Sequence, residues 1–203
     1  MKTQDGRLVV IGGASRSGKT AWVKKAVAAQ TRIIAWDAED QWSALRGWQR
    51  VTSRAALLNC AGKPGALRVA FVPGSDLAAD FDFWSRLVFY AGRYVAPLAC
   101  IAEELADVTT PAKAPGHWGI LLRRGLKRGI TIYAISQRWA EADKTAFGNA
   151  SEFVLFRQSS ADDVRYLAKK TRLDESLING LKPLEFVRFD VLTGQVERGK
   201  LRF

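Results

Sequence analysis

Short apolar runs alternate along the chain with stretches in which apolar residues recur at helical spacing. The runs are rich in β-branched residues and predict six strands, at 7–12, 31–36, 66–72, 97–102, 129–136 and 152–157. Helical spacing is clearest over 81–91 and over 164–168, the second behind a helix-start signal at 159–163. This alternation is typical of an α/β domain whose central sheet is mainly parallel and flanked by helices.

The last stretch of the chain has a different period. Residues 185–203 alternate apolar and polar positions around Thr193-Gly194, which predicts a C-terminal β-hairpin appended to the domain. Loops are expected at the Gly/Pro-rich segments 61–66 and 109–116. With 203 residues, 48% of them hydrophobic, and no internal repeat or linker, we expect a single domain over residues 1–203.

Composition narrows the kinds of chemistry to consider. Lys and Arg total 31 against 20 Asp and Glu, so the net charge is +11, which suits a polyanionic partner or simply a basic protein. Cys60, Cys100 and the single histidine, His117, are too few for a disulfide framework or a His/Cys metal cluster. His117, beside Trp118, is expected at the start of a helix. Neither a signal peptide nor a membrane span is evident, so we expect a soluble, intracellular protein.

A glycine-framed loop follows the first predicted strand and precedes a helix-forming segment. Its spacing matches GxxxxGK[ST], the phosphate-binding P-loop, through Gly13, Ala14, Ser15, Arg16, Ser17, Gly18, Lys19 and Thr20. Backbone N–H groups of such a turn and the helix start surround phosphate oxygens. We expect Lys19 to reach the β- and γ-phosphates of ATP and Thr20 to bind Mg²⁺. Arg16 either touches phosphate or faces solvent.

Polar side chains also follow two later strands. Glu103 and Glu104 come directly after the strand at 97–102, and Gln137 and Arg138 come after the strand at 129–136. Carboxyl ends of parallel strands lie where such folds bind ligands. We expect Glu103 to hold Mg²⁺ through water, Glu104 to polarise the attacking water and Gln137 to sense the γ-phosphate. The alternative for the two glutamates is a solvated helix start.

Taken in order, GASRSGKT, CIAEEL, RRGLKRGITIYAISQR and WAEADKTAFGNASEFVLFR resemble the FtsK/HerA superfamily of DNA-pumping ATPases over about residues 7–170. The resemblance implies a RecA-like fold in which the strand before Gln137 lies between the P-loop strand and the acidic strand. The resemblance also implies that several copies of the chain act together as a ring.

This chain departs from the family pattern at four positions, three of them at strand ends and one before the sensor strand. Glu103 replaces the usual Asp, Ser136 the usual Thr and Trp139 the usual Pro. In the family, the helix before the sensor strand carries an arginine finger that enters the neighbouring subunit, and the aligned position here is Leu126. The surrounding candidates are Arg123, Arg124 and Arg128, of which we favour Arg124; the alternative is a basic surface face.

With 203 residues, the chain resembles a motor domain of this superfamily with little added to it. Such minimal motors resemble the genome-packaging ATPases of tailless, membrane-containing icosahedral viruses. That resemblance implies an ATPase that uses ATP and Mg²⁺ to translocate double-stranded DNA without sequence preference. The implied partners are further copies of the chain, in a hexameric or pentameric ring, and capsid vertex proteins, in the host cytoplasm or at the virion vertex. Segments 38–50 and 109–118 are candidates to contact DNA, whereas the seven tryptophans are expected to pack in cores and interfaces.

Two other functions remain open at this stage. A small-molecule or nucleotide kinase would share the P-loop but needs an arginine-bearing lid and an acceptor site. A membrane-associated phage assembly or secretion ATPase, similar to zonula-occludens-toxin-like proteins, would be expected to carry a membrane span.

Overall fold

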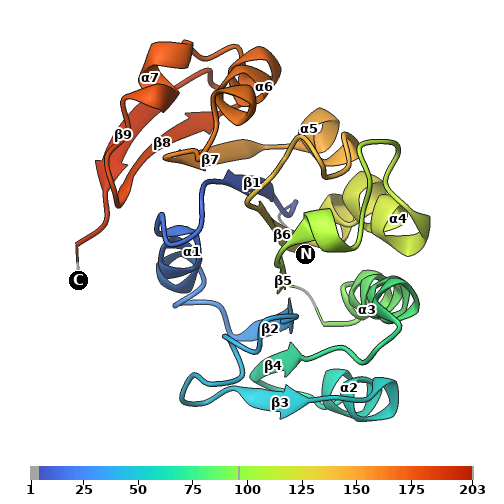
Figure 1. Ribbon diagram of the computed structural model, residues 1–203. Helices are drawn as coiled ribbons and strands as arrows, with labels where there is room; N and C mark the ends of the chain where they lie inside the picture. Colours follow the sequence, from blue (N-terminus) through green and yellow to red (C-terminus); the bar gives the residue numbers. More distant parts are fainter. Residues whose placement is uncertain (1–4, 96, 203) are drawn as a thin grey trace.

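The computed structural model describes residues 5–95 and 97–202. A nine-stranded sheet in the order β3-β4-β2-β5-β6-β1-β7-β8-β9 forms the centre of the molecule (Figure 1). Its strands are β1 (Leu8–Gly12), β2 (Arg32–Trp36), β3 (Gln49–Val51), β4 (Leu67–Phe71), β5 (Leu98–Ala102), β6 (Ile130–Ser136), β7 (Glu152–Phe156), β8 (Glu185–Asp190) and β9 (Val196–Lys200). Strands β1 to β7 pair in parallel, and β8 and β9 add an antiparallel hairpin. The predicted α/β class, its mainly parallel sheet and its C-terminal hairpin are confirmed.

The six strands read from the apolar runs are all present, each within one residue of the expected ends. The sequence pattern missed β3, because its three residues, QRV, are too short to show a period. The appended hairpin continues the main sheet, because β8 pairs with β7. Residue 203, with which the predicted hairpin ended, lies outside the described residues.

Helices connect the strands and cover both faces of the sheet. They are α1 (Lys19–Ala26), α2 (Arg54–Ala61), α3 (Leu77–Ala91), α4 (Gly116–Arg124), α5 (Thr145–Asn149), α6 (Ala161–Thr171) and α7 (Glu175–Asn179), with 3₁₀ turns η1 (Leu105–Asp107) and η2 (Leu126–Arg128). None of the helices in the described part of the chain is both long and apolar enough to cross a membrane.

Two apolar cores lie on opposite faces of the sheet. Alternate residues of β1 divide between them: Leu8 and Val10 pack with side chains from α2 to α7, and Val9 and Ile11 pack with Val23 of α1. Figure 1 shows α1 on one side of the sheet and α3 and α4 on the other. Burial on both faces explains why the parallel strands are continuous apolar runs rather than alternating ones.

The apolar residues that recur at helical spacing in the sequence face the larger of the two cores. Phe81, Trp84 and Val88 of α3 are buried, as are Val164, Leu167 and Ala168 of α6. Ser160 starts α6 by accepting a hydrogen bond from the backbone N–H of Asp163, as the start signal predicted. Five tryptophans are fully buried, which agrees with a packing role for them: Trp36, Trp42, Trp84, Trp118 and Trp139.

The lone histidine and the two cysteines are accounted for by local structure. His117 is the second residue of α4, and its ring Nδ1 lies 2.7 Å from a carboxylate oxygen of Asp82. Cys60 and Cys100 are buried free thiols, and burial raises the pKa of the Cys100 thiol.

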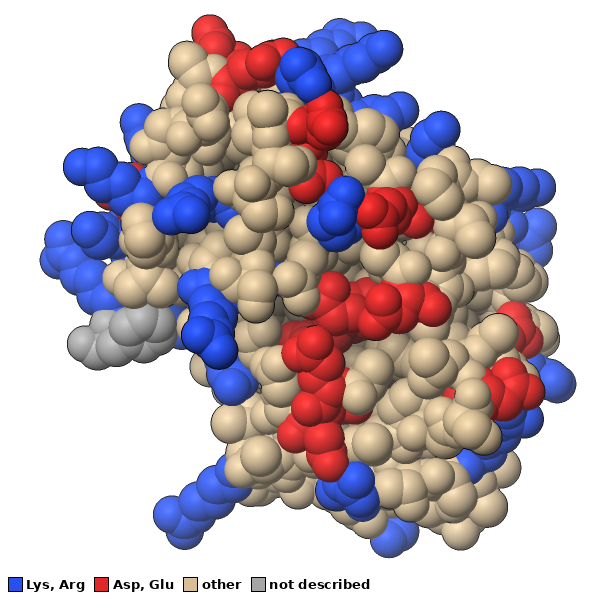
Figure 2. All heavy atoms as spheres, in the orientation of Figure 1, with Lys and Arg blue, Asp and Glu red and all other residues tan. Residues whose placement is uncertain are grey.

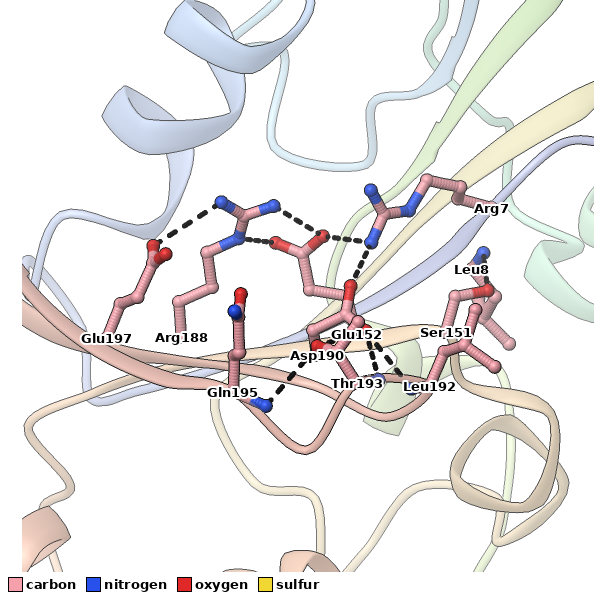
Figure 3. Close-up of polar contacts among 10 residues, drawn as sticks. All are labelled: Arg7, Leu8, Ser151, Glu152, Arg188, Asp190, Leu192, Thr193, Gln195 and Glu197. Atoms are coloured by element: carbon pink, nitrogen blue, oxygen red, sulfur yellow. Dashed lines mark hydrogen bonds and ion pairs between the residues drawn. The ribbon is translucent and has the colours of Figure 1, made fainter.

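An ion-pair network joins the hairpin to the sheet (Figure 3). Glu152, 3% exposed at the start of β7, accepts a hydrogen bond from Arg188 Nε at 2.6 Å and pairs with Arg7 at 3.0 Å. Arg7 also donates to Asp190 at 2.8 Å, at the end of β8. Because a buried carboxylate is costly without partners, these contacts favour the observed register of β7 and β8. The network lies at the edge of the sheet opposite the P-loop, since β7 runs from Glu152 toward that loop.

Candidate functional site

The P-loop joins β1 to α1 in a tight turn with two left-handed residues. Arg16 has φ +58° and Gly18 has φ +116°. The backbone N–H of Ala14 donates to the carbonyl of Arg157 at 2.8 Å, which fixes the loop against the chain that follows β7. A Cβ on Gly13 would lie 2.6 Å from Ser17 Oγ, so only glycine fits there. The N–H groups at the start of α1 have no acceptor within the helix, and together with this turn they have the arrangement typical of an anion site.

Lys19 is folded back onto its own loop. Its ammonium donates to the carbonyl oxygens of Gly13 at 2.8 Å and Ala14 at 3.0 Å, and the residue is 7% exposed. Burial lowers the pKa of Lys19, while the carboxylates of Glu104 and Glu103 oppose that shift. A phosphate oxygen could therefore replace two neutral carbonyls and give this buried ammonium a charged partner.

Thr20 and Glu103 meet on the other side of the loop. Thr20 Oγ1 donates to Glu103 Oε1 at 3.3 Å, and the indole Nε1 of Trp42 donates to the same oxygen at 2.9 Å. Glu103 is 2% exposed, and its burial raises its pKa to about 7. The two hydrogen bonds favour the carboxylate and oppose that rise, whereas the neighbouring carboxylates of Glu104 and Asp37 add to it.

Glu104 and Gln137 are hydrogen-bonded to each other. Gln137 Nε2 donates to Glu104 Oε1 at 2.9 Å, and the Gln137 backbone N–H lies 3.4 Å from Glu104 Oε2. The two side chains meet because β5 and β6 are adjacent parallel strands, with Ala102 opposite Ala134. Burial raises the pKa of Glu104, and its bonds with Gln137 and the charge of Lys19 oppose the rise. Glu104 has φ +46°, a left-handed conformation that is strained for glutamate.

Strand β6 lies between β1 and β5, as the family resemblance implied. The three strand ends therefore converge on one cavity of about 480 Å³, within the range typical of ligand pockets, about 300–1,000 Å³. The P-loop residues 15–20 line this cavity together with Glu103, Glu104 and Gln137.

The charge around the cavity is uneven. Figure 2 shows Asp and Glu side chains gathered in a band across the middle of this face, with Lys and Arg side chains around it. Two of the cavity's carboxylates, Glu103 and Glu104, would face the phosphates of a nucleotide bound to the loop. A divalent cation such as Mg²⁺ would lower the repulsion between charges so arranged.

Sequence reasoning missed the contribution of the segment after β2. Asp37, fully buried, accepts hydrogen bonds from the backbone N–H groups of Gln41, Trp42 and Ser43. These bonds hold Trp42 against Glu103, and Glu39 and Gln41 line the cavity. The signal was available, since Asp37 follows a predicted strand just as Glu103 and Gln137 do.

Segment 38–50, expected as a DNA-contacting loop, is therefore partly a wall of the nucleotide cavity, and it ends in β3. Arg50, one of its basic side chains, forms an ion pair with Asp40 at 2.8 Å. The other candidate segment, 109–118, is anchored by Ala114, whose N–H donates to Thr145 Oγ1, and by the buried Trp118.

Two side chains that follow Gln137 turn away from the cavity. Arg138 pairs with Glu141 at 2.8 Å and lies 3.6 Å from Asp163. Trp139 is 1% exposed, and its indole donates to the carbonyl of Ile11 at 2.9 Å. In place of the family's proline, this tryptophan supports the strand that leads into the P-loop.

The candidate finger arginines do not line the cavity of their own chain. Arg128 precedes β6, and its guanidinium donates to the carbonyl of Phe89 at 2.8 Å and lies 3.5 Å from the ring centroid of Phe89. Arg124, in the last turn of α4, is exposed. It makes no hydrogen bond or ion pair with the residues that the structure describes.

Comparisons with known proteins agree with this architecture. No family model matches the chain. Protein P9 of Pseudoalteromonas phage PM2 is 32% identical over 139 residues, a segment that spans 66% of this chain and 60% of P9. The genome packaging NTPase B204 from Sulfolobus turreted icosahedral virus 2, solved with AMPPCP, matches with a TM-score of 0.81 at 15% identity over 98% of each chain.

A bacterial conjugative coupling protein, TrwBΔN70, matches with a TM-score of 0.69 at 10% identity, over 98% of this chain and 85% of the solved chain. Both structural matches cover 98% of this chain and therefore share its fold. The chain has the fold of the FtsK/HerA-type P-loop ATPases, as the order of its motifs predicted.

Proposed function

We propose that this protein is an ATP-hydrolysing motor that translocates double-stranded DNA, acting in the packaging of a viral genome into a preformed capsid. One observation carries the proposal: a phosphate loop, two carboxylates and an amide meet in one cavity. The similarity to phage PM2 protein P9 and to a genome packaging NTPase supports the packaging role.

Each residue of the cavity has a distinct part in hydrolysis. Lys19 exchanges the carbonyls of Gly13 and Ala14 for β- and γ-phosphate oxygens. The carboxylate of Glu104 accepts a proton from water as the water oxygen attacks the γ-phosphorus. The amide of Gln137 has two hydrogens, so it can keep its bond to Glu104 and donate the second hydrogen to a γ-phosphate oxygen. Gln137 would thereby couple the position of Glu104 to the presence of the γ-phosphate.

The residues present fit Mg²⁺. Thr20 Oγ1 and Glu103 Oε1 lie 3.3 Å apart and offer the oxygen donors that Mg²⁺ prefers, with phosphate oxygens and water completing its shell. Mg²⁺ would neutralise phosphate charge facing the two glutamates. We propose Thr20 as its direct ligand and Glu103 as its partner through water.

We further propose that Arg124 acts in a neighbouring subunit of a homo-oligomeric ring. Arg128 is engaged by Phe89 of its own chain, whereas Arg124, like Arg123, is exposed and without a partner among the described residues. Mixing Arg124→Ala with Glu104→Gln subunits should restore activity in sites that combine an intact Glu104 with a neighbour's Arg124. If no mixing ratio restores hydrolysis, Arg124 is not the finger.

The test of the main proposal is steady-state ATP hydrolysis with and without long double-stranded DNA, at low and high salt. Lys19→Ala should abolish nucleotide binding, and Lys63→Ala, an exposed lysine outside the cavity, is the matched control. If the protein binds the DNA phosphates rather than the bases, duplexes of any sequence should stimulate its ATP hydrolysis. The stimulation should weaken as the salt concentration rises, because phosphate contacts release counterions.

A rate of ATP hydrolysis that is the same with and without DNA would refute the proposed DNA-translocating motor. Turnover that requires an added phosphoryl acceptor would indicate a kinase instead. Unchanged nucleotide binding by Lys19→Ala would refute the P-loop assignment itself.

A further inference from the structure

The nucleotide cavity has a chemically distinct end. Glu103 and Glu104 directly follow β5 and Gln137 directly follows β6, and both strands lie on one side of the P-loop strand β1. On the other side follow β7 and β8, and Leu184, the residue before β8, lines the cavity there. A γ-phosphate held between the two glutamates and Gln137 therefore places the remainder of the nucleotide toward Leu184.

Leu184 also differs in character from the rest of the cavity. Among the residues that line it in the described chain, only Ala21 and Leu184 carry apolar side chains. Ala21 belongs to the first turn of α1, directly after the phosphate-binding Lys19 and Thr20. Phosphate oxygens gain nothing from these two side chains, whereas an aromatic base gains from burying its faces.

The C-terminal hairpin holds Leu184 against the P-loop. A Cβ on Gly18 would lie 2.8 Å from Leu201 Cδ1 and 3.4 Å from Leu184 Cδ2, so both leucines pack directly over that glycine. Leu201, which follows β9, donates its backbone N–H to the carbonyl of Leu184 at 2.9 Å. Phe186 of β8 contacts Trp22 of α1 edge to face, which anchors the base of the hairpin on the helix that follows the P-loop.

The backbone of Leu184 is strained as well. Its φ is +67°, in the left-handed region that leucine seldom adopts. Such conformations persist only where the surrounding structure determines them, and they gather at ligand sites. Here the strain is held by the Leu201 hydrogen bond and by the bond from the Glu185 N–H to the carbonyl of Lys182 at 3.0 Å.

We infer that Leu184, presented by the C-terminal hairpin, forms the nucleobase subsite of the ATP site. This inference rests on the proposed nucleotide binding and extends it to a part of the chain outside the P-loop motifs. The hairpin then has two functional ends. The Arg7–Glu152–Arg188 network holds it at one edge of the sheet (Figure 3), and Leu184 meets the base at the opposite edge.

The experiment compares binding of ATP and of inorganic tripolyphosphate, by calorimetry in Mg²⁺ buffer, to the wild-type chain and to hairpin variants. Tripolyphosphate carries the phosphates without a base, so it reports the P-loop alone. Leu184→Ala should weaken ATP about tenfold, the change expected for losing contact with roughly two methylene groups, and leave tripolyphosphate unchanged. Leu184→Met, which conserves volume and apolar character, should bind ATP with nearly the affinity of the wild type.

Leu192→Ala is the matched control, because Leu192 lies at the hairpin tip, is 93% exposed and is remote from the cavity. Its ATP affinity should equal that of the wild type. Equal weakening of ATP and tripolyphosphate by Leu184→Ala would overturn the inference, since Leu184 would then only support the P-loop. Unchanged ATP affinity in Leu184→Ala would overturn it too. If the wild type binds neither ligand, the proposed nucleotide function fails first.

Discussion

The buried carboxyl of Glu103 should make the nucleotide-free protein less stable at high pH, and Glu103→Gln should remove that cost. Burial raises its pKa from 4.5 to about 7 in the folded chain. Between those two values the folded state binds more protons than the unfolded state, so stability falls as pH rises through that window. Near pH 4 the effect is absent, and above about pH 7 it is complete.

The size of the effect follows from the two pKa values. A difference of about 2.5 units corresponds to about 3 kcal/mol at pH 8, since each unit is worth 1.36 kcal/mol. At pH 5 the same calculation leaves less than about 1 kcal/mol. Glutamine keeps an oxygen that can accept the Trp42 indole hydrogen, so the substitution removes the ionisable proton and retains the hydrogen bond.

The assay is urea unfolding of wild type and Glu103→Gln at pH 5 and pH 8, without nucleotide and with EDTA. We expect the variant to gain about 3 kcal/mol in free energy of unfolding at pH 8 and much less at pH 5. Glu175→Gln, at an exposed glutamate of α7, should show no such difference. An advantage of Glu103→Gln that is equal at both pH values would refute the reasoning, because it could not come from ionisation of this carboxyl.

Three further substitutions test the site and the fold. Glu104→Gln should bind ATP normally and lower kcat by about 10²-fold or more, measured by phosphate release, since an amide cannot accept the water's proton. Trp42→Phe should lower kcat with little change in ATP affinity, because it removes the indole donor that positions Glu103; an unchanged kcat would contradict that role. Arg188→Leu should lower the free energy of unfolding by about 1–3 kcal/mol in urea titrations, because Glu152 stays buried with one partner fewer; unchanged stability would mean that Arg7 suffices.

Much of the architecture could be read from the chain because parallel strands buried on both faces leave a strong local signal. Six apolar runs marked six strands, and the Gly13–Thr20 spacing with its flanking strand and helix marked the P-loop. Strand β3 left no such signal, since three residues at an edge of the sheet show no period. The hairpin was visible from its alternation, but its pairing with β7 was not, because strand order depends on contacts between segments distant in sequence.

The candidate site divides in the same way. Glu103, Glu104 and Gln137 could be proposed from their positions after apolar strands, since the carboxyl ends of parallel strands lie together. Trp42 could not, because its indole reaches Glu103 only through the turn that Asp37 holds after β2. Leu184 lies even farther along the chain from the P-loop, and nothing local sets it apart from a core leucine.

By itself, the sequence determined the fold class, the P-loop motif and the polar strand ends, because each shows in local patterns: the P-loop and the strand ends within one short segment, and the fold class in the alternation of such segments along the chain. Only the tertiary structure decided which side chains meet. Gln137 donates a hydrogen bond to Glu104, Trp42 donates one to Glu103, and Leu184 packs over Gly18. It also set Arg128 apart from the other two candidate arginines, since packing ties Arg128 to Phe89 and leaves Arg123 and Arg124 exposed. Local patterns determine elements, whereas contacts between distant segments depend on how the whole sheet is ordered and covered.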